Sequence, residues 1–288
     1  MRKLCKSTEH FLQKEIDPAF RRRATILVRE LDALPGMKVL DVGCGRGFYE
    51  TLLSIEYSKL QLTGIDSNDS YLKQAQQRNQ SLPRGNKAQF LKEDAAGMKF
   101  KNGSFDRVIC TEVLEHIGQD ETVLKEIRRV LKKGGIALFS VPVANYPFLW
   151  DPANFILERA FGAHLPSRIW WLSGIWADHI RLYTENALLN KLKNNGLFPV
   201  NVWRTTQHCL PFAHFLLYGI GKNLVESGLV GGSFNRFEAK SPPTILHKLV
   251  TWPFNFFDKY NHDEGFIPSV NEGKSTRFLN LVVAAKAQ

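Results

Sequence analysis

Three glycines fall within five positions in the segment VLDVGCGRGFYETLL, residues 39 to 53, between an apolar run and a helix-like run. A glycine-rich turn between a strand and a helix lets a ligand approach the main chain, where the N–H groups of the helix N-terminus point at it. The spacing of Gly43, Gly45 and Gly47 is G-x-G-x-G, and Phe48 stands where dinucleotide-binding turns place a third glycine. No Gly-Lys-Ser/Thr follows, as a P-loop would require. The pattern therefore predicts a strand-turn-helix unit that binds neither NAD, FAD nor a triphosphate.

Strands and helices are expected to alternate along most of the chain. Apolar runs predict strands near residues 37–42, 60–66, 87–92, 104–110 and 135–141, and helical periods predict helices near 46–57, 68–80 and 119–132. The segment LKKGG at 131–135 is typical of a last helical turn and its C-cap. Repetition of strand, helix and strand predicts a parallel sheet covered on both faces.

The pattern changes after the fifth of these strands. Residues 145–177 are rich in aromatic residues and prolines without a clean period, which indicates an insertion over the sheet. A helix is expected to resume in TENALLNKLKNNG, with Thr184 as N-cap and Gly196 as C-cap, before a strand at 197–203. The apolar segment 276–287 is strand-like and is expected to pair with that strand.

The charge of the chain bears on its binding partners, and its cysteines bear on the cellular compartment. The chain of 288 residues has a formal net charge of +10, but its basic excess is spread over both halves. The densest cluster, Arg21 to Arg23, lies in a helix-like stretch, where we expect a solvated face. The four cysteines are far apart and form no CxxC pair, which favours a reduced, cytosolic compartment. We expect neither a signal peptide nor a membrane-spanning helix, because no apolar run reaches the required length.

Five segments stand in a meaningful order: VLDVGCGRG, LTGIDSN, LKEDAAGM, FDRVICTEVLEHI and LKKGGIALFSVP. Together they resemble the motifs of the class I S-adenosylmethionine-dependent methyltransferases, and the resemblance covers roughly residues 25 to 203 and the terminal strand. The segments VLEHI and DHIRLYT are most similar to the type 11 branch of this family, which includes ubiquinone- and menaquinone-biosynthesis methyltransferases. The resemblance implies an α/β, Rossmann-like fold with a seven-stranded, mostly parallel sheet, and S-adenosyl-L-methionine as cofactor.

The resemblance also assigns roles to residues of the first two strands and the turn between them. Gly43, Gly45 and Gly47 would lay the backbone against the amino-acid end of the cofactor, and Asp41 would attract its ammonium group. Asp66 would accept both ribose hydroxyls, since a carboxylate offers two oxygens to a vicinal diol. A purely structural tight turn is the alternative for the glycines.

Two further strand ends complete the implied cofactor site. Asp94 would take the adenine amino group, with Ala95 beside it. Thr111 and Glu112 would lie near the sulfonium and the reacting methyl group. Taken alone, Asp94 is equally well explained as an exposed loop residue. All of these residues follow parallel strands, whose carboxyl ends bind ligands in open α/β sheets.

The acceptor side leaves alternatives open. In ADHIRLYT, the residues His179, Arg181 and Tyr183 would share one face of an extended segment and could meet the methyl group, or could pin the insertion to the core through hydrogen bonds. His116 is either catalytic or packed against the sheet edge. Methyl transfer relies mainly on positioning, and a base matters where the acceptor must lose a proton. We expect no metal, because the isolated NHDEG at 261–265 is no ligand set.

The expected organisation has three parts. An N-terminal helical segment at 1–34 precedes the methyltransferase domain, which consists of residues 35–204 and 276–288. Two insertions, 145–182 and 205–275, would form a helical lid on the acceptor side. We use "the lid" for these two insertions below.

Two stretches of the second insertion have apolar residues at helical spacing. The first stripe is Phe212, Phe215, Leu216, Ile220 and Leu224, and the second is Ile245, Leu249, Trp252, Phe256 and Tyr260. Pro253 is expected to bend or break the second helix. The stripes either cover the protein's own core or form an interfacial surface that meets lipid, which the basic net charge would favour.

The sequence thus predicts an enzyme that transfers a methyl group from S-adenosylmethionine to oxygen or carbon of a hydrophobic or lipid-linked small molecule. We expect a cytoplasmic location, including the inner membrane surface, with peripheral membrane association and no nucleic-acid partner. Two alternatives stay open. The chain could methylate protein or RNA, which its basic excess permits, or it could bind S-adenosylmethionine without catalysis, as a regulatory or assembly protein.

Overall fold

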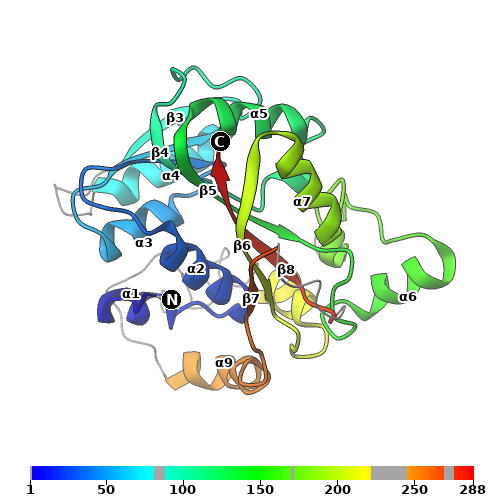
Figure 1. The fold of residues 1–288 in the computed structure, drawn as a ribbon. Coiled ribbons are helices and arrows are strands. Elements are labelled where there is room, and N and C mark those ends of the chain that lie inside the picture. The colour runs from blue at the N-terminus through cyan, green and yellow to red at the C-terminus, as the bar shows by residue number, and fades with distance from the viewer. Residues whose placement is uncertain (1, 81–87, 170–171, 222–244, 269–275) are drawn as a thin grey trace.

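The computed structural model describes residues 2–80, 88–169, 172–221, 245–268 and 276–288. Within them, an eight-stranded sheet has the order β3-β2-β1-β4-β5-β8-β6-β7 (Figure 1). The strands are β1 Lys38–Val42, β2 Gln61–Asp66, β3 Gln89–Lys92, β4 Phe105–Thr111, β5 Leu131–Pro142, β6 Leu197–Thr205, β7 Glu264–Phe266 and β8 Asn280–Ala287. Strands β1 to β5 pair in parallel, whereas β8 is antiparallel to both β5 and β6.

The predicted parallel sheet is confirmed, and so is the pairing of the last apolar segment, whose Ala287 lies opposite Leu197 of β6. The sheet has one strand more than expected because β7 adds to the edge of β6. Strand β7 has only three residues, which are too few for an alternation of apolar and polar residues to reveal it in the sequence. The expected helical turn at 131–135 is wrong, because Leu131 already pairs with Phe105 of β4 and begins β5.

Helices cover both faces of the sheet, as Figure 1 shows. They are α1 Lys6–Leu12, α2 Pro18–Leu31, α3 Phe48–Glu56, α4 Asp69–Gln80, α5 Asp120–Val130, α6 Pro152–Phe161, α7 Glu185–Asn194 and α9 Ile245–Asp258. Helices α5 and α7 pack on one face together with Leu40 and Val42, while α1 to α4 pack on the other with Val39 and Leu138. This division follows the strand period of two, which turns successive side chains to opposite faces.

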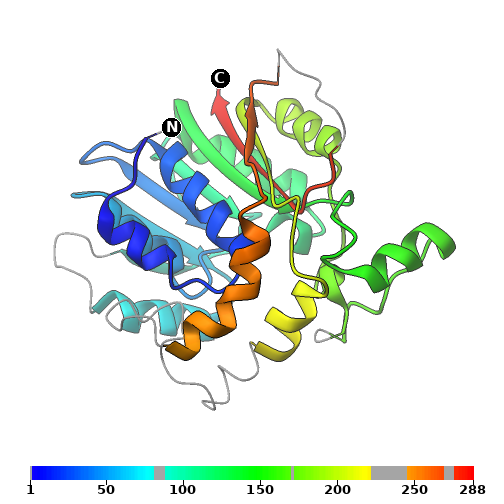
Figure 2. The ribbon, with the colours of Figure 1, turned by 90° about the horizontal axis from the view of Figure 1, so that it is seen from below.

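The lid lies at one edge of the sheet (Figure 2). Its first part leaves the carboxyl end of β5, its second part leaves the carboxyl end of β6, and the chain returns at the start of β8. This is also the edge at which β1 and β4 end, because β1, β4 and β5 are parallel. A small separate core holds the lid together and includes Tyr146, Trp150, Ile175, Ala213 and Phe254. The lid therefore stands next to the glycine loop.

The first insertion contains a helix that its sequence did not predict. In α6, the Asp151 carboxylate caps the helix by accepting the Asn154 N–H, and Pro152 occupies the first turn. Asp151 and Pro152 are the sequence features from which the start of this helix could have been predicted. Trp150 is buried as expected of a covered insertion, whereas Phe161 is exposed. Trp170 and Trp171 lie outside the described residues.

The second insertion contains a short π-helix, η4, at Phe215–Gly221, and the longer helix α9. Leu224 of the first stripe lies outside the described residues. Helix α9 continues through Pro253, so of the two expected outcomes, a bend or a break, the break does not occur. Contacts hold it on both sides of the proline: the His247 ring bonds to the Lys14 carbonyl oxygen, and Asp258 binds Arg22 of α2.

Candidate active site

The loop between β1 and α3 needs its glycines. Gly43, Gly45 and Gly47 have φ angles of +74°, +52° and +78°, in the left-handed region that other residues rarely adopt. A Cβ atom on Gly43 would collide with the Val113 side chain, which follows β4. A Cβ atom on Gly45, in contrast, would meet nothing within 4 Å. Gly45 therefore faces open space, through which a ligand can reach the main chain.

Asp66, at the end of β2, holds this loop in place. One carboxylate oxygen accepts the Gly45 N–H at 2.9 Å, and the other accepts the Asn68 N–H at 2.8 Å. Each oxygen keeps a lone pair for another donor. The structure thus brings Asp66 to the open side of the loop, and its contact with ribose hydroxyls stays a prediction.

Two carboxylates lie buried beneath the same loop. Among the described residues, neither Asp41 of β1 nor Glu50 of α3 has a hydrogen-bond partner for its carboxylate oxygens. Burial, followed by the charges of Glu50 and Asp66, raises the pKa of Asp41 well above its usual range. Burial likewise raises the pKa of Glu50 to about 8. A cationic ligand would favour their ionised forms, so the residues present fit a cofactor that carries an ammonium and a sulfonium group.

Asp94 follows β3 and is exposed. Its carboxylate accepts the Ala96 N–H at 2.9 Å and so shapes the turn that contains Ala95. Ala95 itself is partly buried against the main core. This arrangement leaves the second carboxylate oxygen of Asp94 at the surface, and its predicted bond to an adenine amino group remains untested.

Glu112, directly after β4, is fixed by contacts with β5 and α2. Its φ is +52°, and its N–H donates to the Ser140 carbonyl oxygen at 2.8 Å. Its carboxylate accepts the Ser140 hydroxyl at 2.6 Å and lies 3.5 Å from the Arg23 guanidinium of α2. The preceding Thr111 hydrogen-bonds the Tyr49 side chain of α3. Because the next residue, Val113, packs on Gly43, this strand end lies against the glycine loop, and its position near the sulfonium stays a prediction.

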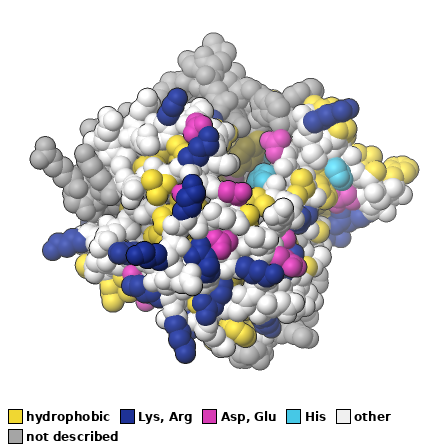
Figure 3. Space-filling model, turned by 90° about the horizontal axis from the view of Figure 1, so that it is seen from above, with side chains coloured by type: hydrophobic (Ala, Val, Ile, Leu, Met, Phe, Trp, Pro, Cys, Tyr) yellow, Lys and Arg dark blue, Asp and Glu magenta, His cyan; other side chains and the backbone are white. Residues whose placement is uncertain are grey.

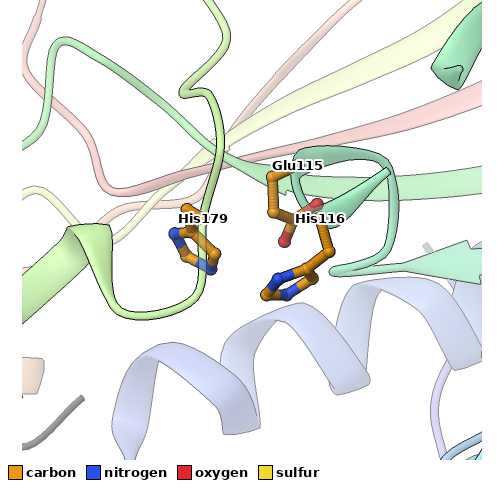
Figure 4. Close-up of side chains that lie close together, drawn as sticks. All are labelled: Glu115, His116 and His179. Carbon is orange, nitrogen blue, oxygen red and sulfur yellow. The ribbon is translucent and has the colours of Figure 1, made fainter. Parts of the chain in front are cut away.

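Three further side chains meet beside this strand end: Glu115, His116 and His179 (Figure 4). Glu115 and His116 belong to the short 3-10 helix η2, Leu114–His116, and His179 follows η3, Gly174–Trp176. The two imidazole ring centroids are 4.7 Å apart. Burial, aided by the charge of His116, lowers the pKa of His179 to about 4, so the imidazole is neutral at physiological pH. The two histidines predicted as catalytic candidates are thus neighbours.

Arg181 and Tyr183 bind other partners. The Arg181 guanidinium lies 2.8 Å from the Asp120 carboxylate and donates to the Ile117 carbonyl oxygen at 2.9 Å. The Tyr183 hydroxyl donates to the same Asp120 carboxylate at 2.5 Å. Both side chains thus turn towards residues 114–120. The contacts are those of a segment pinned to the core, so we leave Arg181 and Tyr183 out of the proposed reaction.

Sequence reasoning missed the part that α2 plays in the site. The expectation that Arg21 to Arg23 form a solvated face is wrong. Arg23 is buried beside Glu112, while the guanidinium of Arg21 binds the Asp258 carboxylate of α9 at 2.8 Å. These arginines lose solvent because α2 lies between the sheet and α9. The acidic Asp258 and Asp263 at the end of the second apolar stripe were the available signal.

Comparison with known proteins agrees with this geometry. Residues 40–139 match the family model described as "Methyltransferase domain". A sterol 24-C-methyltransferase of Aspergillus fumigatus is 36% identical over 118 residues, 41% of this chain and 31% of that protein. A 2-methyl-6-phytyl-1,4-hydroquinone methyltransferase of Synechocystis is 38% identical over 107 residues, 37% of this chain and 32% of that protein. The chain thus spans about a third of the length of these curated relatives.

Solved structures extend the likeness of the fold to nearly the whole chain. A SAM-dependent methyltransferase of Thermotoga maritima, described as a possible histamine N-methyltransferase, aligns with a TM-score of 0.52 at 14% identity. The alignment covers 98% of this chain and 91% of that one. Residues 40–139 of this chain therefore match a methyltransferase domain, and the fold of nearly the whole chain is similar to that of solved methyltransferases.

Proposed function

We propose that this chain transfers a methyl group from S-adenosylmethionine to oxygen or carbon of a hydrophobic or lipid-linked small molecule. The observation that carries the proposal is the open space over Gly45, bordered by Asp66 and underlain by the unpaired carboxylates Asp41 and Glu50. The names of the matched sterol and hydroquinone methyltransferases support an apolar acceptor. The aromatic lid beside the same sheet edge supports it as well.

S-adenosylmethionine supplies an electrophilic methyl group on a sulfonium cation. The residues of this chain bind the cofactor and orient it for the transfer. Gly43, Gly45 and Gly47 admit the ligand to the main chain, Asp66 is placed for hydroxyl donors, and the acids beneath the loop attract positive charge. Glu112, held by Ser140 and Arg23, fixes the strand end that faces the loop. Holding two reactants in line is a large part of what catalysis of this transfer requires.

Transfer to a macromolecule is the alternative for the acceptor. On the face shown in Figure 3, lysine and arginine side chains are interspersed with aspartate and glutamate, so this face does not favour a dedicated nucleic-acid site. A protein that binds nucleic acid through phosphates would gather its basic residues on one face.

Radiolabelled S-adenosylmethionine can identify the acceptor class. The protein is incubated with separate lipid, RNA and protein fractions of its source cell, and each fraction is counted. We expect label in the organic phase. Label in RNA or protein instead would replace the proposed acceptor, and absence of label from all fractions, with cofactor binding intact, would favour the non-catalytic alternative.

A pair of glycine variants tests the cofactor loop. Gly45→Val should abolish binding of S-adenosylhomocysteine in calorimetry, because the side chain would fill the space that the ligand needs. Gly36→Val is the matched control, since Gly36 also has a positive φ of +88° and open space around its Cβ position but lies in the turn before β1. Both variants bear the same backbone strain. Equal binding by both would mean that the loop is not the cofactor site.

The lid also supports a peripheral location at the inner, cytoplasmic surface of a membrane. In α9, the side chains of Ile245, Leu249 and Trp252 are 80%, 67% and 66% exposed, and Phe212 and Phe215 of the first stripe are exposed as well. Exposed apolar side chains in such number are typical of an interaction surface. In the part of the chain that the structure describes, no helix is long and apolar enough to cross a bilayer. The net charge of +10 favours contact with acidic lipid.

Co-sedimentation with liposomes of acidic and of neutral phospholipid tests this location. The intact protein should sediment with acidic liposomes. The double variant Phe212→Ser and Trp252→Ser should bind them less while keeping its melting temperature, because both side chains already face solvent. A large fall in melting temperature, together with no liposome binding by the intact protein, would sink the proposal.

A further inference from the structure

We propose that Glu115, His116 and His179 form a binding site for a divalent transition-metal ion of the zinc type. One potential ligand atom from each of the three side chains lies within 4.8 Å of the others. Figure 4 shows the carboxylate and the two imidazole rings gathered between η2 and the segment that follows η3. Two imidazoles and one carboxylate are a ligand set that suits zinc, iron and related ions. The sequence hid this site because 62 residues separate His179 from His116.

The histidine rings are oriented as metal ligands are. The Nδ1 atom of His116 lies 2.9 Å from the Asp178 carbonyl oxygen, and the Nδ1 atom of His179 lies 2.5 Å from the Ile175 carbonyl oxygen. A carbonyl oxygen can only accept, so we assign the proton of each ring to Nδ1. Each Nε2 then keeps its lone pair. Metal-binding histidines commonly donate their second N–H to a backbone carbonyl or carboxylate in this way.

Glu115 is the second, independent observation. Its side chain is fully buried, and among the described residues no donor reaches either carboxylate oxygen. A buried carboxylate without a partner is costly, and native structures pair such groups or bind them to an ion. Arg23 is the nearest candidate cation, but its salt bridge goes to Glu112 at 3.5 Å. A metal ion between Glu115 and the two histidines would satisfy the carboxylate.

The spacing fits a site that closes slightly on binding. With bonds of about 2.1 Å, a tetrahedral ion holds its ligand atoms about 3.4 Å apart. The three side chains therefore need to move inward by about 1 Å, which small side-chain rotations supply. His116 is exposed and is free to make such a rotation, whereas Glu115 and His179 are held by their surroundings. Three protein ligands leave the fourth position open to another molecule.

That open position has a consequence, which rests on the proposed methyl transfer. The site directly follows Glu112 and Val113, and Val113 packs on Gly43 of the cofactor loop. An acceptor hydroxyl bound there would have its pKa lowered by the ion and would lose its proton to solvent. The oxygen would then form a bond to the methyl carbon while the bond from that carbon to sulfur breaks, leaving a neutral thioether. The site therefore favours acceptors that carry a hydroxyl group.

Metal binding is measured on the full chain after dialysis against a chelator. We expect isothermal titration with Zn²⁺ to show one ion per chain. His116→Ala should weaken zinc binding by at least about tenfold, and because this side chain is exposed the fold should persist. Glu115→Gln, which keeps the shape of the side chain, should weaken it as well. His262→Ala is the control, because His262 is an exposed histidine outside the cluster.

The outcomes separate this site from the proposed function. No binding by the intact protein, or equal binding by the intact protein and His116→Ala, would overturn the metal site. A protein that binds zinc through these residues but methylates no fraction leaves the site standing and contradicts the proposed function. A protein that methylates lipid at an unchanged rate in chelator and binds no zinc has the proposed function without the site.

Discussion

Helices α5 and α9 have the same kind of amphipathic period and use it in opposite ways. Helix α5 buries its apolar side chains, Val123, Leu124, Ile127 and Val130, and exposes charged ones such as Glu121 and Lys125 on its other face. Helix α9 exposes Ile245, Leu249, Trp252 and Phe256 and buries His247, Thr251 and Phe254. A stripe in the sequence therefore shows that a helix has two faces. What covers each face depends on the rest of the chain.

The inward face of α9 is tolerated because its polar groups have partners. The His247 ring bonds to the Lys14 carbonyl oxygen, the Thr251 hydroxyl donates to the His247 carbonyl oxygen, and Asp258 binds two arginines of α2. A buried polar group costs little once it is hydrogen-bonded. The outward apolar face has no such explanation within the described residues, and a lipid surface would supply one.

The largest effect is expected in α5. Leu124→Ala removes a fully buried side chain from the main core, so the free energy of unfolding should fall by about 2–5 kcal/mol. Denaturant titration followed by circular dichroism measures it. A loss below 1 kcal/mol, on the order of a surface change, would mean that α5 is not the ordinary core helix of the comparison.

A smaller effect is expected where the polar face of α9 meets α2. Asp258→Asn keeps the shape of the side chain but removes the charge that Arg21 and Arg22 share, and should lower the free energy of unfolding by about 1–3 kcal/mol. Asp69→Asn is the control, because its ion pair with Lys92 is mostly exposed. Equal melting curves for the two variants would show that α9 does not depend on its inward polar contacts.

Charge beside the apolar face should tune lipid binding. Lys248→Glu with Lys259→Glu reverses two exposed charges of the α9 region, and binding to acidic liposomes should weaken by about 1 kcal/mol per residue or more. Lys125→Glu on the exposed face of α5 is the matched control and should change binding little. Co-sedimentation at low and high salt provides the measurement. The same loss in both proteins would mean that net charge, and not the α9 surface, governs the association.

The smallest effect sharpens the comparison most. Leu249→Ala in α9 is the same chemical change as Leu124→Ala in α5, yet it should alter the free energy of unfolding by no more than about 0.5 kcal/mol. The side chain is already in water in the free protein. A loss near that of Leu124→Ala would show that the outward face of α9 is packed against something in solution, such as a second copy of the chain.

The sheet and the glycine loop could be predicted from sequence because their signals are local. Alternation of strands and helices, the spacing of Gly43, Gly45 and Gly47, and an acidic residue at or near the end of each of the first four strands are all visible within short windows. The helix cap at Thr184 was visible for the same reason, and its hydroxyl does accept the Ala187 N–H. Such local patterns indicate whether a segment forms a strand, a helix or a turn.

The rest could not be predicted because it depends on contacts between distant segments. Arg22 meets Asp258, 236 positions away, and Arg23 of α2 meets Glu112, which directly follows β4 of the sheet. His116 and His179 become neighbours only when the first insertion folds back beside η2. No period or propensity in the sequence records such contacts. For this reason the expected solvated face of the arginines is wrong, and the proximity of Glu115, His116 and His179 was not visible in the sequence.

The three successive arginines of α2 connect two parts of the protein, helix α9 and the strand end beside the glycine loop. Arg21 and Arg22 form salt bridges with Asp258 of α9, whose outer face is apolar. Arg23, one position further along, forms a salt bridge with Glu112 beside the glycine loop. Successive residues of a helix point about 100° apart, so a single turn can reach both neighbours. This turn of α2 connects the two regions directly. A displacement of α9 would therefore act on the same helical turn that sets the position of Glu112.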